Sequence, residues 1–132
     1  MDTLHTSNLN YKYQKENDLD NNFGLMVISL EGEFSPKGFM ALPEKILEHC
    51  KLEDTYNVLI NSIEVNYQSL TTMHRFNLGE KFAEELGGKV NLAIVLRSEY
   101  LNKFGETVAV NRGLKGFATD SLEEARNWFV EQ

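Results

Sequence analysis

Residues 56–96 read YNVLINSIEVNYQSLTTMHRFNLGEKFAEELGGKVNLAIVL. Residues 56–61 form a short β-branched and aliphatic run bounded by polar residues, which is typical of a strand buried on both faces. Residues 69–86 place apolar side chains at helical spacing, and Gly87 and Gly88 end that helix by offering a left-handed residue. Residues 89–96 begin a second buried strand. A strand, a helix and a strand in this order predict two parallel strands joined by a right-handed crossover, and therefore an α/β fold.

The segments before this unit predict a hairpin and a helix. Residues 8–15 alternate apolar and polar side chains, and residues 23–34 form a denser apolar run, so an antiparallel pair of strands is expected. A helix is expected from Ser35, which can act as N-cap with Pro36 at the first helical position. Pro43 lies inside the helical pattern and predicts a kink or a break.

The segments after the unit predict a helix, a strand and a final helix. Ser98 can cap a third helix that ends at the stop signal of residues 111–113. A short fifth strand is expected at residues 114–118. Asp120 and Glu123 have capping-box spacing and open the last helix. The predicted order is β-β-α-β-α-β-α-β-α, a mixed five-stranded sheet with packed helices.

Composition sets the broad class of the protein. With 132 residues, of which 42% are hydrophobic, one globular core is expected, and we interpret residues 1–7 as a flexible leader and 8–132 as a single domain. The 13 Lys and Arg against 20 Asp and Glu give a net charge of −7, which disfavours nucleic acid and anionic membrane surfaces as partners. Apolar runs are far shorter than the roughly 20 residues that span a bilayer, so no membrane insertion is expected. Because Cys50 has no second cysteine to pair with, the cysteine usage fits a reducing compartment, and a cytoplasmic location is expected.

The sequence offers little catalytic or metal-binding chemistry. His5, His49 and His74 are scattered without a ligand spacing, so no metal and no cofactor is predicted. Nucleophile-elbow, dinucleotide-binding and phosphate-cradling motifs are missing from the sequence, and no catalytic residue is assigned. An uncharacterised enzyme stays an alternative for which no nucleophile and base pair can be named.

The order of elements and the sequence texture resemble the STAS domain family, with its anti-sigma-factor antagonist-like fold, and especially small stand-alone bacterial members of unknown function. The residues that carry the resemblance are NVLIN at 57–61, RFNLGE at 75–80, VNLAIV at 90–95, NRG at 111–113 and the terminal helix at 121–129. The resemblance covers roughly residues 8 to 131. It implies a single-domain STAS-like fold and a non-enzymatic regulatory module that binds an unknown protein partner or associates with itself.

The resemblance also implies a candidate phospho-switch. In the switched members, a serine in an Asp-Ser-Ser-Gly-like context starts the helix after the central strand and is modified by a kinase. Ser69 lies at about that position here, within NYQSLTT, but the aspartate and the glycine are missing. A phosphate at a helix N-terminus would meet unpaired N–H groups and the positive end of the helix dipole. The alternative is that Ser69 acts only as an N-cap.

Two binding sites are predicted near the same edge of the sheet. Ligands of open α/β sheets bind at the carboxyl ends of the strands, and the residues expected to line a small polar or anionic pocket there are Asn61, Ser69, Arg75 and Arg97. Alternatively, Arg75 lays its methylene stem along the rim of the core and pairs with an acid. The second site is a partner surface made by three apolar residues outside regular structure, Ile63, Val65 and Tyr67, which alternatively fold back onto the core.

A different function is a carrier of small molecules or lipids, since some proteins of similar fold resemble the CRAL-TRIO lipid-binding class. Its cavity would be lined by aromatic residues of the first two helices, Phe39, Phe76 and Phe82. A dry, filled core is the alternative interpretation of the same residues.

Overall fold

A computed structural model of the chain describes residues 2–3, 9–18 and 23–132. Residues 1 and 4–7 of the expected leader, residue 8 of the first expected strand and His5 lie outside the described residues. Asp2–Thr3 forms a short strand, β1, which pairs with Asn10–Asp18 (β2).

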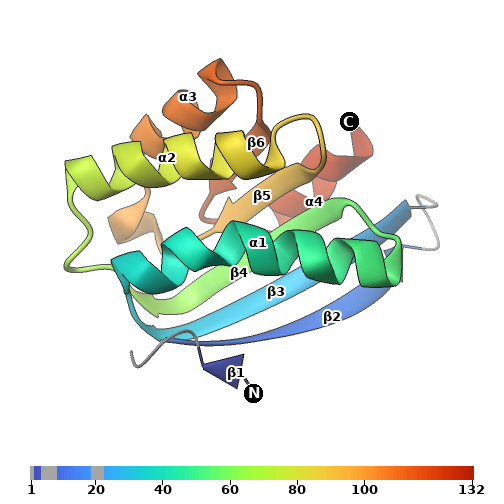
Figure 1. Cartoon of the computed structure of the whole chain (residues 1–132), viewed down its shortest axis with the longest axis horizontal. Helices are drawn as coiled ribbons and strands as arrows, with labels where there is room; N and C mark the ends of the chain where they lie inside the picture. Colours follow the sequence, from blue (N-terminus) through green and yellow to red (C-terminus); the bar gives the residue numbers. More distant parts are fainter. Residues whose placement is uncertain (1, 4–8, 19–22) are drawn as a thin grey trace.

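One mixed sheet runs through the molecule, with its strands in sequence order (Figure 1). The remaining strands are Phe23–Glu33 (β3), Asn57–Asn66 (β4), Asn91–Val95 (β5) and Lys115–Thr119 (β6). β1, β2 and β3 are antiparallel, whereas β3, β4, β5 and β6 are parallel. The predicted hairpin and the predicted five strands are therefore confirmed, with β1 as a short addition. Ile60 of β4 lies beside Ile94 of β5 in a parallel pair, so the crossover that decided the fold class is confirmed as well.

The helices form a layer on each face of the sheet. They are Pro36–Glu53 (α1), Thr72–Leu86 (α2), Phe104–Asn111 (α3) and Leu122–Val130 (α4). Figure 1 shows α1 and α2 across the near face and α4 behind the sheet. α3 packs against α2 and β6.

The residues of β4 alternate between the two layers. Val58 and Ile60 belong to the large cluster under α1 and α2, whereas Leu59 belongs to the smaller cluster under α4, together with Phe129. This alternation is the period-2 geometry of a strand. It explains why a central strand of an α/β sheet is apolar at every position.

The predicted start of α1 is confirmed. The Ser35 Oγ accepts a hydrogen bond from the Gly38 N–H at 3.0 Å, and Pro36 occupies the first turn, where its missing N–H costs nothing. The expected break at Pro43 does not occur, because α1 continues through it to Glu53.

Three other helix starts were predicted wrongly. α2 is capped by Thr71, whose Oγ1 accepts from the His74 N–H at 3.1 Å, so Ser69 is not the N-cap. Ser98 begins only a short 3₁₀ turn, Ser98–Tyr100 (η1), and the third helix begins later, at Phe104, with Lys103 as its N-cap. α4 is capped by Ser121, whose Oγ accepts from the Glu124 N–H at 3.1 Å, rather than by Asp120.

Candidate functional site

The carboxyl ends of β4 and β5 point to the same edge of the sheet because the two strands are parallel, and β4 extends five residues beyond its last pair with β5, Asn61 and Val95. β4 continues through a turn closed by a hydrogen bond from the Leu70 N–H to the Tyr67 carbonyl at 2.8 Å, and then enters α2. β5 continues into η1. This edge of the sheet is where open α/β folds bind ligands.

Tyr100 of η1 connects the residues at this edge. Its carbonyl accepts a hydrogen bond from the Arg75 Nη2 at 2.8 Å, and its hydroxyl accepts one from the Arg97 Nη2 at 3.0 Å. The same hydroxyl donates to the Asn66 Oδ1 at 3.1 Å. The Arg97 guanidinium also lies 5.1 Å from the centre of the Tyr100 ring and forms an ion pair with Glu99.

Arg75, unlike Arg97, forms no ion pair with any other described residue. None of the ion pairs among the described residues includes Arg75, so the predicted pairing with an acid is not found. Its guanidinium is partly buried, and this burial lowers its pKa from the usual value, with a smaller opposite effect from Tyr67. Arg75 therefore brings a positive charge to this edge of the sheet. The one described hydrogen bond of its side chain goes to a neutral group, the Tyr100 carbonyl.

Tyr67 is buried together with its hydroxyl group. The side chain is 4% exposed, and its ring packs edge-on against the rings of Phe39 and Tyr100, with centroids 5.7 Å away in each case. Within the described part of the chain, the hydroxyl has no hydrogen-bond partner. Burial raises the pKa of the Tyr67 hydroxyl, whereas a hydrogen-bond interaction with the nearby Ser62 hydroxyl and the positive charge of Arg75 lower it by smaller amounts. The Ser62 hydroxyl donates its own proton to the Val95 carbonyl at 2.8 Å.

A pocket of about 140 Å³ lies between α2, α3 and the α2-covered face of β5 and β6, and we call it the α2–α3 pocket. Most of its lining is apolar, and Tyr67 and Arg75 are among the lining residues. Leu92 and Ile94 of β5 face into it beside their partners on β6, which are Gly116 and Ala118. Small residues also stand on the helices that cover it, at Gly79, Gly105 and Ala109. The pocket exists because these positions carry too little side-chain volume to fill the space between the layers.

The predicted anion pocket does not assemble as expected. Asn61 alternates with the residues under α2 and therefore lies on the face of the sheet opposite Arg75, where its Oδ1 accepts from the Ile63 N–H at 3.3 Å. Ser69 is exposed in the turn before α2. The structure brings Arg75 and Arg97 together through Tyr100. Tyr100 and Asn66 were not among the predicted site residues, although Tyr100 lies five residues after the end of β5 and three residues after Arg97.

The predicted partner surface is also corrected. Val65 is 1% exposed and Tyr67 is 4% exposed, so both fold back onto the core, and Ile63 packs partly against the cluster under α4. The reason is a bulge. The register between β3 and β4 shifts after the pair Ser29 and Asn61, and the extra residue of β4 turns Val65 and Tyr67 toward α1 and α2.

Another apolar surface is exposed at the N-terminal end of α2. Met73 is 64% exposed, and Phe76 lies one helical turn further along the same side. The Phe76 ring stacks on that of Phe104, which is 39% exposed, with centroids 6.5 Å apart. We call these three residues the Met73 surface. The Arg112 guanidinium borders it, 5.5 Å from the centre of the Phe76 ring.

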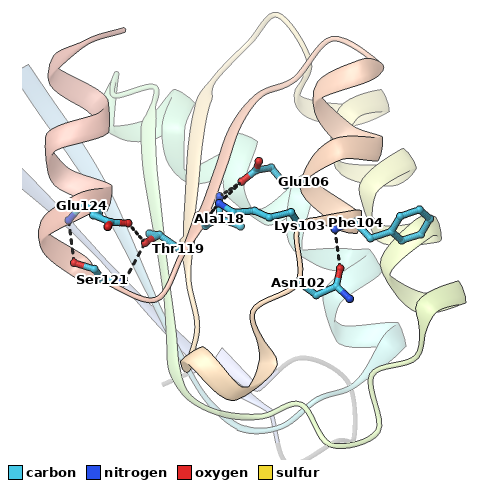
Figure 2. A network of polar contacts seen from close by, with 8 residues as sticks. All are labelled: Asn102, Lys103, Phe104, Glu106, Ala118, Thr119, Ser121 and Glu124. Atoms are coloured by element: carbon cyan, nitrogen blue, oxygen red, sulfur yellow. Dashed lines mark hydrogen bonds and ion pairs between the residues drawn. The ribbon is translucent and has the colours of Figure 1, made fainter.

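A second polar network lies between α3, β6 and α4 and has a structural role. Figure 2 shows Lys103 and Glu106 reaching the backbone of Ala118, where Glu106 Oε2 accepts from the N–H at 2.5 Å and Lys103 Nζ donates to the carbonyl. Because β6 is the last strand of the sheet, these side chains satisfy groups that a further strand would otherwise pair.

No cluster of three or more His, Cys, Asp or Glu side chains suited to a metal occurs in the described ranges. Likewise, none of the described helices combines the length and apolar character needed to span a bilayer.

Comparisons with known proteins agree with the fold. No protein-family model matches the chain, and no curated protein matches it in sequence. Among solved structures it is similar to the crystal structure of an anti-sigma factor antagonist from Mycobacterium paratuberculosis, with a TM-score of 0.55 and 17% sequence identity over 93% of this chain and 96% of that one. The chain therefore has the STAS-like α/β fold that its sequence predicts.

Proposed function

We propose that the protein is a non-enzymatic regulatory module that binds a protein partner through the Met73 surface. The observation that carries this proposal is the exposure of Met73, 64%, at the start of α2 beside the aromatic pair Phe76 and Phe104. Exposed apolar side chains gathered in one place are characteristic of interaction sites. The solved structure of similar fold is described as an anti-sigma factor antagonist, a name that denotes action on another protein.

The chemistry of the Met73 surface fits a partner with an apolar contact surface. Methionine and phenylalanine are enriched in the buried centres of interfaces, and a charged rim sets the orientation of the partner. Arg112 and Glu80 form an ion pair at 3.0 Å next to Phe76 and supply such a rim. A second copy of this chain is the alternative binding partner for the Met73 surface.

The test compares one disruptive substitution with a matched control. Met73→Glu should weaken capture of the partner from host extract, and its binding once purified, by about tenfold or more, because a charge is then desolvated in an apolar contact. Leu52→Glu makes a comparable apolar-to-acid change on α1, at a residue that is 71% exposed, and should leave binding unchanged. Equal loss in both variants, or in neither, contradicts the proposal. Light scattering of the purified protein distinguishes a second copy from another protein.

We further propose that Ser69 is the regulated position of this module. It is exposed in the turn two residues before the N-cap Thr71, so a kinase can reach it, and a phosphate there would add negative charge beside the Met73 surface. Ser69→Glu should weaken partner binding relative to Ser69→Ala. Gln68→Glu places the same charge one residue earlier and serves as the control. If the three variants bind equally, the switch is refuted while the partner surface is not.

The setting of this function follows from the same chain. We propose that residues 8–132 act as one domain. We also propose that the protein works in the cytoplasm, because its single cysteine fits a reducing compartment.

The lipid-carrier alternative gains little from the α2–α3 pocket, because 140 Å³ is about half of the roughly 300 Å³ at the lower end of ligand pockets. Phe39 and Phe82 line this pocket as the carrier alternative expects, whereas Phe76 stacks on Phe104 outside it.

A further inference from the structure

We infer that Met73 is a site of reversible oxidation, and that conversion of its thioether to the sulfoxide weakens binding at the Met73 surface. The inference rests on the proposed function, because it concerns the regulation of that same surface. It follows from how exposed each sulfur-containing residue of the chain is, from the place of Met73 in the surface, and from the polarity that one added oxygen atom brings.

Met73 is the most exposed sulfur-containing residue in the described part of the chain. It is 64% exposed, compared with 37% for Met40 and 0% for Met26, and Met1 lies outside the described residues. The single cysteine, Cys50, is wholly buried, and burial raises its pKa to about 11, so that little of the reactive thiolate forms. An oxidant in the solvent therefore reaches Met73 more readily than it reaches the other described sulfur atoms.

The reaction is a two-electron oxidation of the thioether by a peroxide. The Sδ lone pair attacks one peroxide oxygen, and an S–O bond forms as the O–O bond breaks. The displaced hydroxide takes the proton of the new S–OH group and leaves as water, so the sulfur is oxidised and the peroxide is reduced. Methionine sulfoxide reductases reverse the change. Two thiols are then oxidised to a disulfide, and the sulfoxide oxygen leaves as water.

Oxidation at this position changes the Met73 surface where it is most exposed. The sulfoxide turns a flexible apolar side chain into a polar one. Burial of a polar group in an apolar contact is unfavourable unless it finds a hydrogen-bond partner. The other two residues of the surface, Phe76 and Phe104, have no side-chain N–H or O–H group to donate to the sulfoxide oxygen. A partner with an apolar contact surface should therefore bind the oxidised protein more weakly.

The effect should stay at the surface and leave the fold intact. The start of α2 is held by hydrogen bonds in which Met73 takes no part. The Thr71 N–H donates to the His74 Nδ1, and the Thr71 Oγ1 accepts from the His74 N–H, both at 3.1 Å. Met26, in contrast, lies in the core, so its oxidation requires the protein to open.

The first measurement needs no partner. Full-length protein is treated with dilute hydrogen peroxide at neutral pH, and peptide mass spectrometry gives the sulfoxide content of each methionine. Met73 should be oxidised at least about tenfold faster than Met26, because only Met73 is accessible in the native state. A methionine sulfoxide reductase with a thiol reductant should restore Met73. Protein oxidised at Met73 should keep the urea midpoint of untreated protein.

The second measurement uses the partner purified in the test of the proposed function. The protein is oxidised alone, and the peroxide is removed before the partner is added. Oxidation should weaken binding by the wild type about tenfold, and the reductase should restore it. Met73→Leu keeps an apolar side chain of similar volume, and its affinity should be the same before and after peroxide treatment. Met40→Leu is the matched control and should stay as sensitive to peroxide as the wild type.

The possible failures separate this inference from the proposed function. The inference is overturned, while the proposed function stands, if Met73 is oxidised no faster than Met26 or if the reductase does not restore it. The same holds if protein oxidised at Met73 binds the partner as tightly as untreated protein although Met73→Glu binds weakly. Loss of binding by Met73→Leu after peroxide treatment also overturns the inference. If Met73→Glu binds normally, the proposed function fails, and the inference fails with it.

Discussion

The buried hydroxyl of Tyr67 is expected to lower the stability of the folded protein. Its hydroxyl is buried without a described partner, which costs about 1–3 kcal/mol in a typical protein. Tyr67→Phe keeps the ring contacts with Phe39 and Tyr100 and removes the unsatisfied group. We expect the free energy of unfolding, measured in urea at neutral pH, to rise by about 1 kcal/mol. A decrease would show that the hydroxyl is hydrogen-bonded in solution.

The same residue makes a prediction about alkaline pH. Because burial raises the pKa of Tyr67 in the folded state, the unfolded chain ionises first, from about pH 10. The native state then binds more protons than the unfolded state, so stability is unaffected below that pH and falls above it. This decline should be smaller in Tyr67→Phe than in the wild type.

Cys50 is expected to be an inert thiol. It is wholly buried, and burial raises its pKa from 9.0 to about 11. Since the thiolate is the reactive form, a difference of about two pH units means roughly a hundredfold less thiolate at pH 8 than in the unfolded chain. Reaction with a chromogenic disulfide reagent should therefore be at least about a hundredfold slower in native protein than in guanidinium. A native rate within tenfold of the unfolded rate contradicts this.

The sequence did not reveal the burial of Val65 and Tyr67, for a reason that lies in the backbone. Apolar periodicity assigns faces only while a strand keeps its period of two. The bulge in β4 adds one residue and exchanges the faces beyond it. A bulge of this kind has no side-chain signature here, so the strand was expected to end at Asn61, whereas Ile63 and Val65, which were expected outside regular structure, belong to β4.

At the level of elements, α2 and α3 approach each other at a glycine. A Cβ at Gly79 would lie 2.8 Å from the Gly105 carbonyl oxygen and 2.9 Å from the Val108 Cβ, which is closer than atoms in proteins pack. Gly79→Ala should therefore push the helices apart and lower the free energy of unfolding by about 1–3 kcal/mol, despite the better helix propensity of alanine. The control is Asn77→Ala, at an exposed position of the same helix, which should be neutral or slightly stabilising. Equal unfolding midpoints for the two variants would contradict the close approach.

The edge strand β6 depends on side chains of α3. Glu106 satisfies the Ala118 N–H and pairs with Lys103 at 3.1 Å (Figure 2). Glu106→Ala removes the partner of a buried N–H and should lower the free energy of unfolding by about 1–3 kcal/mol. It should also increase aggregation, measured by light scattering, because the edge of the sheet is then less protected. Glu48→Ala, at an exposed position of α1, is the control, and a similar effect in both variants would refute the capping role.

The elements themselves were largely predictable, and their ends were less so. The existence of α1, α2 and the parallel strands follows from apolar spacing, because packing on the sheet requires it. The start of a helix depends on which polar side chain reaches a free N–H, and neighbouring candidates compete. For this reason the N-caps of α2 and α4 are Thr71 and Ser121, and not the predicted Ser69 and Asp120. The α2–α3 pocket could not be predicted, since it arises where small residues from separate elements meet.

For the whole molecule, the two layers share the strands between them. β4 contributes Val58 and Ile60 to the cluster under α1 and α2, and Leu59 to the cluster under α4. If β4 leaves the sheet, both clusters lose apolar residues at the same time, because the same backbone segment carries both sets of residues. The chain should therefore unfold as one cooperative unit.

The single tryptophan makes this cooperativity measurable. Trp128 lies on the α4 side of the sheet, where its ring stacks on Phe117 with centroids 5.6 Å apart. Its fluorescence reports the smaller layer, whereas far-UV circular dichroism reports all helices and strands, and the two urea transitions should have the same midpoint if unfolding is two-state. The double variant Trp128→Phe, Phe82→Trp moves the probe to the other layer, beside the α2–α3 pocket that has room for the larger ring. The fluorescence of this double variant should change with the same urea midpoint as its far-UV circular dichroism. If Trp128 changes at a lower urea concentration while most of the dichroism remains, α4 and its cluster unfold separately, and residues 8–132 do not behave as one domain.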